Sequence, residues 1–107
     1  MAGAAAEPAG VRADLTRRID AIDRVCDHLG LSEIAGELAF IRRAARASGI
    51  APAVTVLHAM DAILSRGERG PRVHAGLAIL RDAIDCPSSD ARTCDTFAAA
   101  CSVRLGG

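Results

Sequence analysis

Apolar residues recur along most of this chain at intervals of three and four, and this spacing restricts the possible folds more than any other feature. Leu15, Ile19, Ile22, Cys26 and Leu29 follow it without a break. Residues three or four apart lie on the same side of an α-helix, in which one turn takes about 3.6 residues. No stretch alternates apolar and polar residues between turn signals, as a half-buried strand does. The sequence therefore predicts an all-α protein.

Glycine and proline residues divide this pattern into five predicted helices. They cover residues 11–29, 32–48, 51–66, 71–85 and 90–104. Gly30 is expected to end the first helix in a left-handed conformation, and Ser32 is expected to cap the second. Short connections favour antiparallel neighbours. We therefore expect an antiparallel up-down four-helix bundle with a fifth helix at the C-terminal end.

The chain has 107 residues, which is enough for one hydrophobic core but not for two. Residues 1–10 are mostly Ala and Gly with one Pro and one Glu. They have little to bury, so we expect a disordered N-terminal tail. Residues 11–107 are expected to form a single helical-bundle domain.

The charges of the chain are balanced, with 13 basic and 13 acidic residues. Sequence-independent binding of nucleic acid depends on an excess of positive charge, so the balance argues against it. No apolar run approaches the roughly 20 residues that span a bilayer. The first ten residues also lack the charged and Leu-rich regions of a secretory signal. We expect a cytoplasmic protein that binds neither nucleic acid nor a membrane.

Four cysteines, Cys26, Cys86, Cys94 and Cys101, are candidates for metal or redox chemistry. Their spacing lacks the compact pairs of structural zinc sites, so we predict no metal site and no cofactor. Cys26, Cys94 and Cys101 fall on the apolar faces of the first and fifth predicted helices. Small buried side chains that join these two helices are the favoured interpretation. A disulfide between Cys86 and Cys94 across the intervening turn is the alternative.

The histidines His28, His58 and His74 lie on three different predicted helices. None stands at a recognisable motif spacing from a Ser or Cys nucleophile, and acid, base and nucleophile candidates do not converge. We therefore do not expect an enzyme. His74 is expected to face solvent and His58 to lie at the margin of the core. A redox or metal protein that uses the cysteines with His28 or His58 stays an open alternative.

Arg42, Arg43 and Arg46 form the densest cluster of charge in the chain. Phe40 falls off the apolar face of the same helix, so we expect it to be partly exposed unless the fifth helix covers it. An exposed aromatic residue among arginines has the composition of an interface hot spot. Clustered arginines also favour association with an acidic partner. Together with Ala39 these residues form the predicted partner-binding face, for which a solvated helix surface is the alternative interpretation.

The stretch from residue 31 to residue 84 resembles part of a histidine phosphotransfer (HPt) domain of the chemotaxis-kinase type. The residues that carry the resemblance are Gly49, Ile50, His58, Met60, Asp61, Leu64, Arg66 and Gly67. The resemblance implies four antiparallel helices. It also implies that the partner is a response-regulator receiver domain or a kinase domain.

The chain departs from the HPt pattern at the phosphoacceptor motif His-x-x-Lys-Gly. Counted back from Gly49, Ala39 stands at the position of the acceptor histidine and Arg43 at the position of the glycine. Arg42 keeps the positive charge of the lysine. Alanine has no nitrogen to phosphorylate. The resemblance therefore implies a pseudo-HPt adaptor or regulator that binds a signalling partner without relaying phosphate.

A self-associating helical module is the main alternative function. Phe40, Val56 and Ile63 lie on secondary apolar stripes of their predicted helices. Such stripes can close a homodimer when they remain exposed in the monomer. A homodimer is therefore possible from the sequence.

Overall fold

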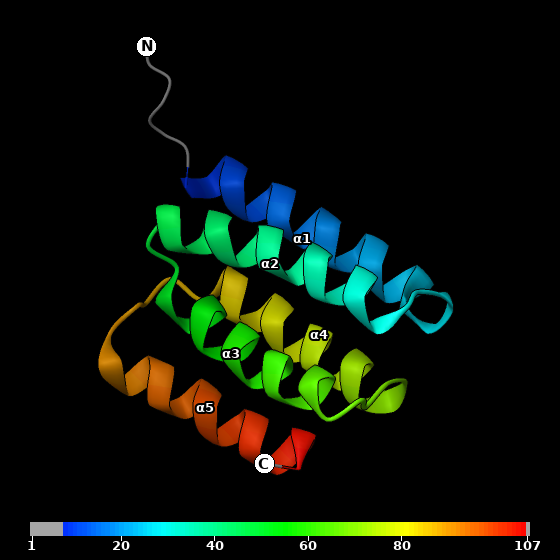
Figure 1. Cartoon of the computed structure of the whole chain (residues 1–107). Coiled ribbons are helices and arrows are strands. Elements are labelled where there is room, and N and C mark those ends of the chain that lie inside the picture. The colour runs from blue at the N-terminus through cyan, green and yellow to red at the C-terminus, as the bar shows by residue number, and fades with distance from the viewer. Residues whose placement is uncertain (1–7, 107) are drawn as a thin grey trace.

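The computed structural model describes residues 8–106, which form five α-helices and contain no strand. The helices are Pro8–Val25 (α1), Leu31–Ala47 (α2), Ala51–Ser65 (α3), Pro71–Asp85 (α4) and Ala91–Leu105 (α5), and a 3₁₀ turn, Cys26–His28 (η2), follows α1. The prediction of an all-α protein is confirmed, including the fifth helix. Figure 1 shows that consecutive helices run in alternating directions.

α3 lies at the centre of the arrangement, where it packs against α2, α4 and α5. α4 packs against α1, α3 and α5, and α1 also contacts α2. Figure 1 shows α1 and α5 at opposite edges of the molecule. The cysteines of the first and fifth helices therefore do not join these helices to each other. α5 covers α3 and α4 and leaves the outer side of α2 open.

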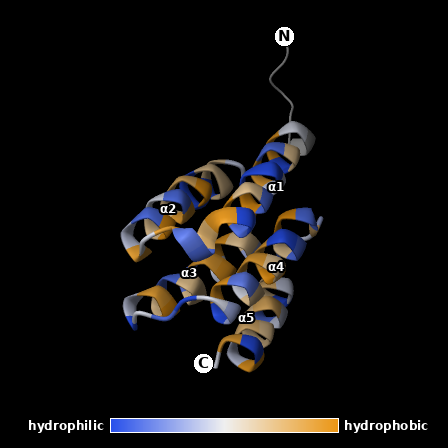
Figure 2. Ribbon diagram, turned by 90° about the vertical axis from the view of Figure 1, so that its right-hand side faces the viewer, coloured by the Kyte–Doolittle hydropathy of each residue, from blue (hydrophilic) through white to orange (hydrophobic). Residues whose placement is uncertain are grey.

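The core is built from apolar side chains of all five helices, and no polar or charged side chain is buried with them among residues 10–106. The largest fully buried side chains are Leu15, Ile19, Ile34, Leu38, Ile41, Ile50, Leu57, Met60, Ile63, Leu77, Leu80 and Ile84. Figure 2 shows that hydrophobic residues predominate along α3, the central helix. Along α1, hydrophilic residues alternate with hydrophobic ones. Full burial of each such side chain contributes about 1.5–3 kcal/mol, so the helix-period stripes account for the assembly.

The glycines end the helices as expected at some positions and not at others. Gly49 and Gly67 have φ angles of 71° and 78°, the left-handed conformation that is common just after a helix. Gly30 instead has a φ angle of −73° and is the N-cap of α2. Its N–H donates to the Glu33 carboxylate at 2.8 Å. Ser32 therefore lies inside α2, and the prediction that it caps this helix is wrong.

α1 begins at Pro8, three residues before the predicted start. The segment 8–10 is thus helical, and residues 1–7 of the predicted tail lie outside the described residues. The α-helical part ends at Val25, and the chain tightens into η2. In a 3₁₀ turn, side chains three residues apart lie on the same side, as those of Asp23 and Cys26 do at the end of α1.

α3 buries more of its surface than predicted because three helices surround it. Val56 and Ile63, which were expected on stripes that could close a homodimer, are both buried in the core. That interpretation is wrong for these two residues, and only Phe40 of the three remains exposed. Val54 on the same helix is only partly buried.

Within residues 8–106, no helix combines the length and the apolar character needed to cross a membrane.

Candidate functional site

The predicted binding face of α2 is divided between two flanks of the helix. Successive residues are turned by about 100° around a helix axis, so neighbours in sequence point in different directions. Phe40 meets α1, through Arg18. Arg42 meets α3, through Asp61. Arg43 stays exposed between these two flanks. The residues chosen from the sequence are therefore exposed in part but do not form one continuous contact surface.

The flank toward α1 carries an exposed aromatic ring beside two arginines. Phe40 is 41% exposed. The guanidinium carbon of Arg18 lies 3.9 Å from the centroid of its ring, and that of Arg43 lies 5.9 Å from it. A cation is attracted to an aromatic face within about 6 Å of the centroid. We call Arg18, Phe40 and Arg43 the Arg–Phe cluster.

Arg18 is the member of this cluster that the sequence did not single out. It belongs to α1, and it lies 22 positions before Phe40 in the chain. The only local signal is that Arg17 and Arg18 lie off the apolar stripe of the helix. Which residue of α2 it contacts depends on how α1 and α2 pack, and the sequence pattern does not contain that information.

The flank toward α3 is already occupied by an internal ion pair. Nη1 of Arg42 donates to the Asp61 carboxylate, which joins α2 to α3. Both side chains remain a third or more exposed. Arg46 is exposed and lies farther along the helix, beside a shallow depression that Val54 and Cys94 also line. Of the three arginines chosen from the sequence, only Arg43 belongs with Phe40.

Ala39, which stands at the phosphoacceptor position of the HPt pattern, is half-buried on α2. Its methyl group can contact a partner but cannot carry a phosphoryl group. No protein-family model, curated protein or solved structure matches this chain. The HPt resemblance stays a prediction.

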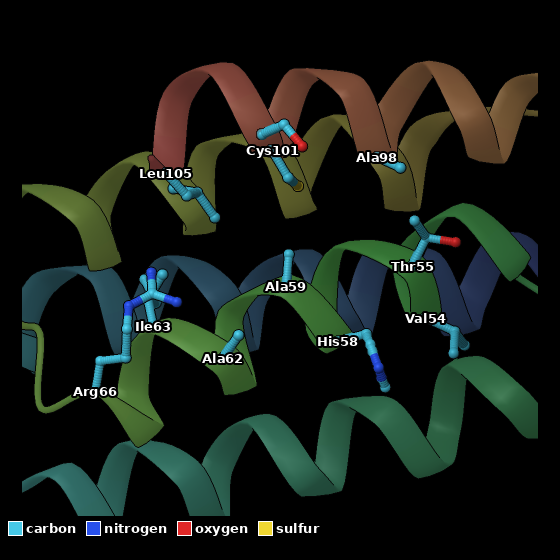
Figure 3. A pocket seen from close by; sticks show the side chains of 11 residues that line it. Val54, Thr55, His58, Ala59, Ala62, Ile63, Arg66, Ala98, Cys101 and Leu105 are labelled. Atoms are coloured by element: carbon cyan, nitrogen blue, oxygen red, sulfur yellow. The ribbon is translucent and has the colours of Figure 1, made fainter. Parts of the chain in front are cut away.

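A second surface feature is a groove of about 490 Å³ between α3 and α5. Its lining residues are Val54, Thr55, His58, Ala59, Ala62, Ile63, Arg66, Ala98, Cys101, Ser102 and Leu105. Figure 3 shows Ala98, Cys101 and Leu105 on the side of α5 that faces α3, whereas His58 points away from α5. The groove is therefore mostly apolar and brings no acid, base and nucleophile together.

All four cysteines are free thiols. Cys86 and Cys94 are partly buried, and the disulfide that their spacing suggested is not formed in this structure. Cys101 is buried between the helices, and burial raises the pKa of its thiol. A raised pKa disfavours the thiolate, which is the reactive form of cysteine.

The third feature is a polar cluster at the contact between α1 and α4. His74 does not simply face solvent, as the sequence suggested, because α1 and η2 each present a carboxylate to it. Its Nδ1 lies 2.5 Å from the Asp23 carboxylate, and its Nε2 lies 3.0 Å from that of Asp27. The hydrogen bond to Asp23 raises the pKa of His74 most, while partial burial opposes the rise and Asp27 supports it. The imidazole therefore links the carboxylates of Asp23 on α1 and Asp27 on η2.

Cys26 lies in the same cluster, with its Sγ 3.5 Å from Nε2 of His74. The metal and redox alternative paired the cysteines with His28 or His58, but both of these side chains are exposed and neither belongs to the group of neighbouring donor atoms. A nucleophilic Cys-His-Asp arrangement is nevertheless disfavoured. Burial, and then the charges of Asp27 and Asp23, raise the pKa of Cys26. The attacking thiolate is therefore scarce, and Asp27 competes for Nε2.

Proposed function

We propose that this protein is a non-catalytic interaction module that binds an acidic protein partner through the Arg–Phe cluster. In this proposal α1–α4 act as an antiparallel up-down bundle, and α5 braces α3 and α4. The observation that carries the proposal is the 41% exposed ring of Phe40 with the guanidinium of Arg18 3.9 Å from its centroid.

The cluster has the properties of a binding hot spot. Burying the exposed part of a Phe ring against a partner contributes free energy on the scale of about 1.5–3 kcal/mol for a whole side chain. The ring already lies against the Arg18 guanidinium of α1, which restricts its motion, so less side-chain freedom is lost on binding. Aromatic residues and arginines are also the residue types enriched in such hot spots.

The charges of the cluster are available to a partner. Among residues 8–106, neither Arg18 nor Arg43 has a carboxylate within ion-pair distance, in contrast to Arg42. The net charge of the whole chain is zero, so attraction must come from local charge. The partner that fits is a surface with Asp or Glu residues around an apolar patch that accepts the Phe40 ring.

The HPt resemblance makes a receiver or kinase domain of a two-component system the first class of partner to test. With Ala39 in place of a phosphoacceptor histidine, the protein would occupy such a partner without relaying phosphate. That behaviour is expected of an adaptor or regulator. The proposal includes a cytoplasmic location, which is the prediction from the sequence.

The test is a direct binding measurement against a panel of purified receiver and kinase domains from the source organism. We expect at least one member to bind, and we expect Phe40→Ala and the double variant Arg18→Glu, Arg43→Glu to abolish that binding. The matched control is Arg92→Glu on α5, an exposed arginine on the other side of the fold. It should bind like the unmodified protein.

Two outcomes count against the proposal. One is a panel in which no domain binds, and the other is binding that the cluster variants leave unchanged. Sedimentation over a range of protein concentrations distinguishes self-association from binding to an acidic partner. A dimer that dissociates in Phe40→Ala would assign the cluster to self-association instead of to an acidic partner.

A further inference from the structure

Metal-binding side chains gather where the C-terminal end of α1 meets the start of α4. Asp23, Cys26 and His74 each offer one ligand atom, and these atoms lie within 4.8 Å of one another. Asp27 adds a carboxylate on the other nitrogen of the same imidazole. The donors therefore come from two helices and include sulfur, nitrogen and oxygen.

The local sequence explains why α1 presents these groups together. Asp23, Cys26 and Asp27 are three and four residues apart, and this spacing keeps them on one side of the helix as it tightens into η2. His74 lies at the end of the first turn of α4. An ion pair of 3.0 Å between Asp20 and Arg81 lies farther along the same two helices and fixes their register.

The distances suit one small ion after a minor adjustment. Metal–ligand bonds of about 2.0–2.3 Å in a tetrahedral site place the donors about 3.3–3.7 Å apart. The Sγ atom of Cys26 is 3.9 Å from Nδ1 of His74, and that nitrogen is 2.5 Å from the Asp23 carboxylate. The same sulfur lies 3.5 Å from Nε2, so the partly exposed imidazole must turn to direct Nδ1 toward an ion beside the sulfur, and the Nδ1–Asp23 separation must lengthen by about 1 Å. The Asp23 side chain is half exposed, so it is free to make this adjustment.

We propose that Asp23, Cys26 and Nδ1 of His74 bind one divalent transition-metal ion, with Zn²⁺ as the ion that fits the donors best. Thiolate, imidazole and carboxylate are the ligands that zinc takes in proteins. Calcium and magnesium are excluded because they take oxygen ligands. Asp27 is a positioning residue that accepts a hydrogen bond from Nε2 and holds the imidazole, as carboxylates beside zinc-bound histidines do.

The surroundings of the cluster favour a cation. A shallow depression of about 350 Å³ between α1 and α4 adjoins it, and Asp20, Asp23 and Asp82 are among its lining residues. Arg81 lines the same depression and pairs with Asp20, so Asp23 and Asp82 supply the negative charge that favours the approach of a cation. Cys26 itself is 2% exposed, so its sulfur closes the inner end of the site. An ion held there would join α1 to α4, which makes the site structural.

The test is metal titration of the full chain after treatment with a chelator. Co²⁺ is the probe for geometry, because thiolate ligation gives a sulfur-to-cobalt charge-transfer band and tetrahedral ligation gives intense visible bands. We expect one Co²⁺ per chain, displaced by one Zn²⁺. A competing chromophoric chelator then measures the Zn²⁺ affinity.

His74→Asn and Asp23→Asn should each weaken Zn²⁺ binding by more than about tenfold, and Asp27→Asn by about tenfold. The matched controls are His58→Asn and Cys94→Ser, which alter the same residue types outside the cluster. Cys26→Ser should abolish the charge-transfer band. If its loss of core packing prevents folding, the half-exposed Asp23 and the partly exposed His74 decide the question.

A wild-type titration without a thiolate-to-cobalt band overturns the proposal. So does Zn²⁺ binding that is unchanged in His74→Asn or is lost equally in His58→Asn. Circular dichroism of each variant shows whether its helices are intact. The partner-binding variants Phe40→Ala and Arg18→Glu, Arg43→Glu should bind Zn²⁺ normally, so the two proposals can fail separately.

Discussion

Gly76 on α4 lies directly against the side chain of Met60 on α3. A Cβ atom at Gly76 would lie 2.9 Å from Cε of Met60 and 3.0 Å from its Cγ. Both residues are buried, at the contact between α3 and α4. The absence of a side chain at position 76 is thus what allows α3 and α4 to approach, despite the low helix propensity of glycine.

We expect Gly76→Ala to lower the free energy of unfolding by roughly 1–2 kcal/mol. Overpacking of a core typically costs about 1–3 kcal/mol, and the better helix propensity of alanine returns up to about 1 kcal/mol. Urea denaturation measures the difference. The control is Gly36→Ala on α2, where an added Cβ meets no atom within 4 Å. It should stabilise the protein, and stabilisation by both substitutions would contradict the close packing of α3 on α4.

Arg42 and Arg43 should behave differently although they are neighbours. We expect Arg42→Ala to cost up to about 1 kcal/mol of stability, because a partly exposed ion pair with Asp61 is lost. Arg43→Ala should have no measurable effect on stability. A double-mutant cycle of Arg42→Ala and Asp61→Ala isolates the pair, and the coupling should shrink as salt is added. If Arg43→Ala lost more stability than Arg42→Ala, Arg43 and not Arg42 would make the stabilising contact.

Asp90 caps α5 and should make the stability of this helix depend on pH. Its carboxylate accepts a hydrogen bond from the N–H of Thr93 at 2.8 Å, which lowers its pKa below the usual 3.8. A lowered pKa in the folded state gives stability that is present above the unfolded-state pKa and lost as the pH falls through the folded value.

The measurement for Asp90 is thermal unfolding between neutral and acidic pH. We expect Asp90→Ala to melt lower than the wild type at neutral pH and the gap to close below about pH 4. Asp90→Asn is the control, because its side chain still caps the helix but does not titrate. If the difference in melting temperature stayed constant down to the lowest pH, the Asp90 carboxylate would be excluded as the cause of the pH dependence.

The four thiols should differ in their reactivity. Cys26 and Cys101 are buried and have raised pKa values, so they should react slowly with a thiol reagent such as Ellman's. Cys86 and Cys94 are partly exposed and should react first. Intact mass after alkylation of the denatured protein without reductant should show four labelled thiols. A mass lower by two labels would establish the Cys86–Cys94 disulfide.

Zinc should stabilise the protein if the site between α1 and α4 binds it. A ligand that binds only the folded state adds about 2.7 kcal/mol at a free concentration one hundred times its dissociation constant. We expect the melting temperature to rise with Zn²⁺ and to return after a chelator is added. His74→Asn should show no such rise. An equal rise in this variant would mean that the ion binds elsewhere.

Local sequence signals were sufficient for the helices themselves. Residues 71–85 were predicted as one helix because Pro71 opens it and apolar residues follow at helical spacing, and α4 has these bounds. Gly49 and Gly67 mark the ends of α2 and α3 in the left-handed conformation. The prediction that Gly30 ends the first helix in a left-handed conformation was wrong, because a glycine can serve either as the end of one helix or as the N-cap of the next.

The candidate sites depended on contacts that no local signal describes. Arg18 and Phe40 meet because α1 packs beside α2, and Cys26 meets His74 because α1 packs beside α4. Val56 and Ile63 are buried because α3 packs against α2, α4 and α5. In each case the partner residue lies on another helix.

The sequence by itself determined that this chain is helical, where each helix lies within a few residues, and that one core must hold the helices together. These properties follow from hydrogen bonds within each helix and from the helical spacing of apolar residues, both of which involve near neighbours. Only the tertiary structure decided which faces stay exposed and which polar side chains meet. Those contacts depend on the side-by-side order and register of helices that are distant in sequence, where many pairings bury similar apolar area.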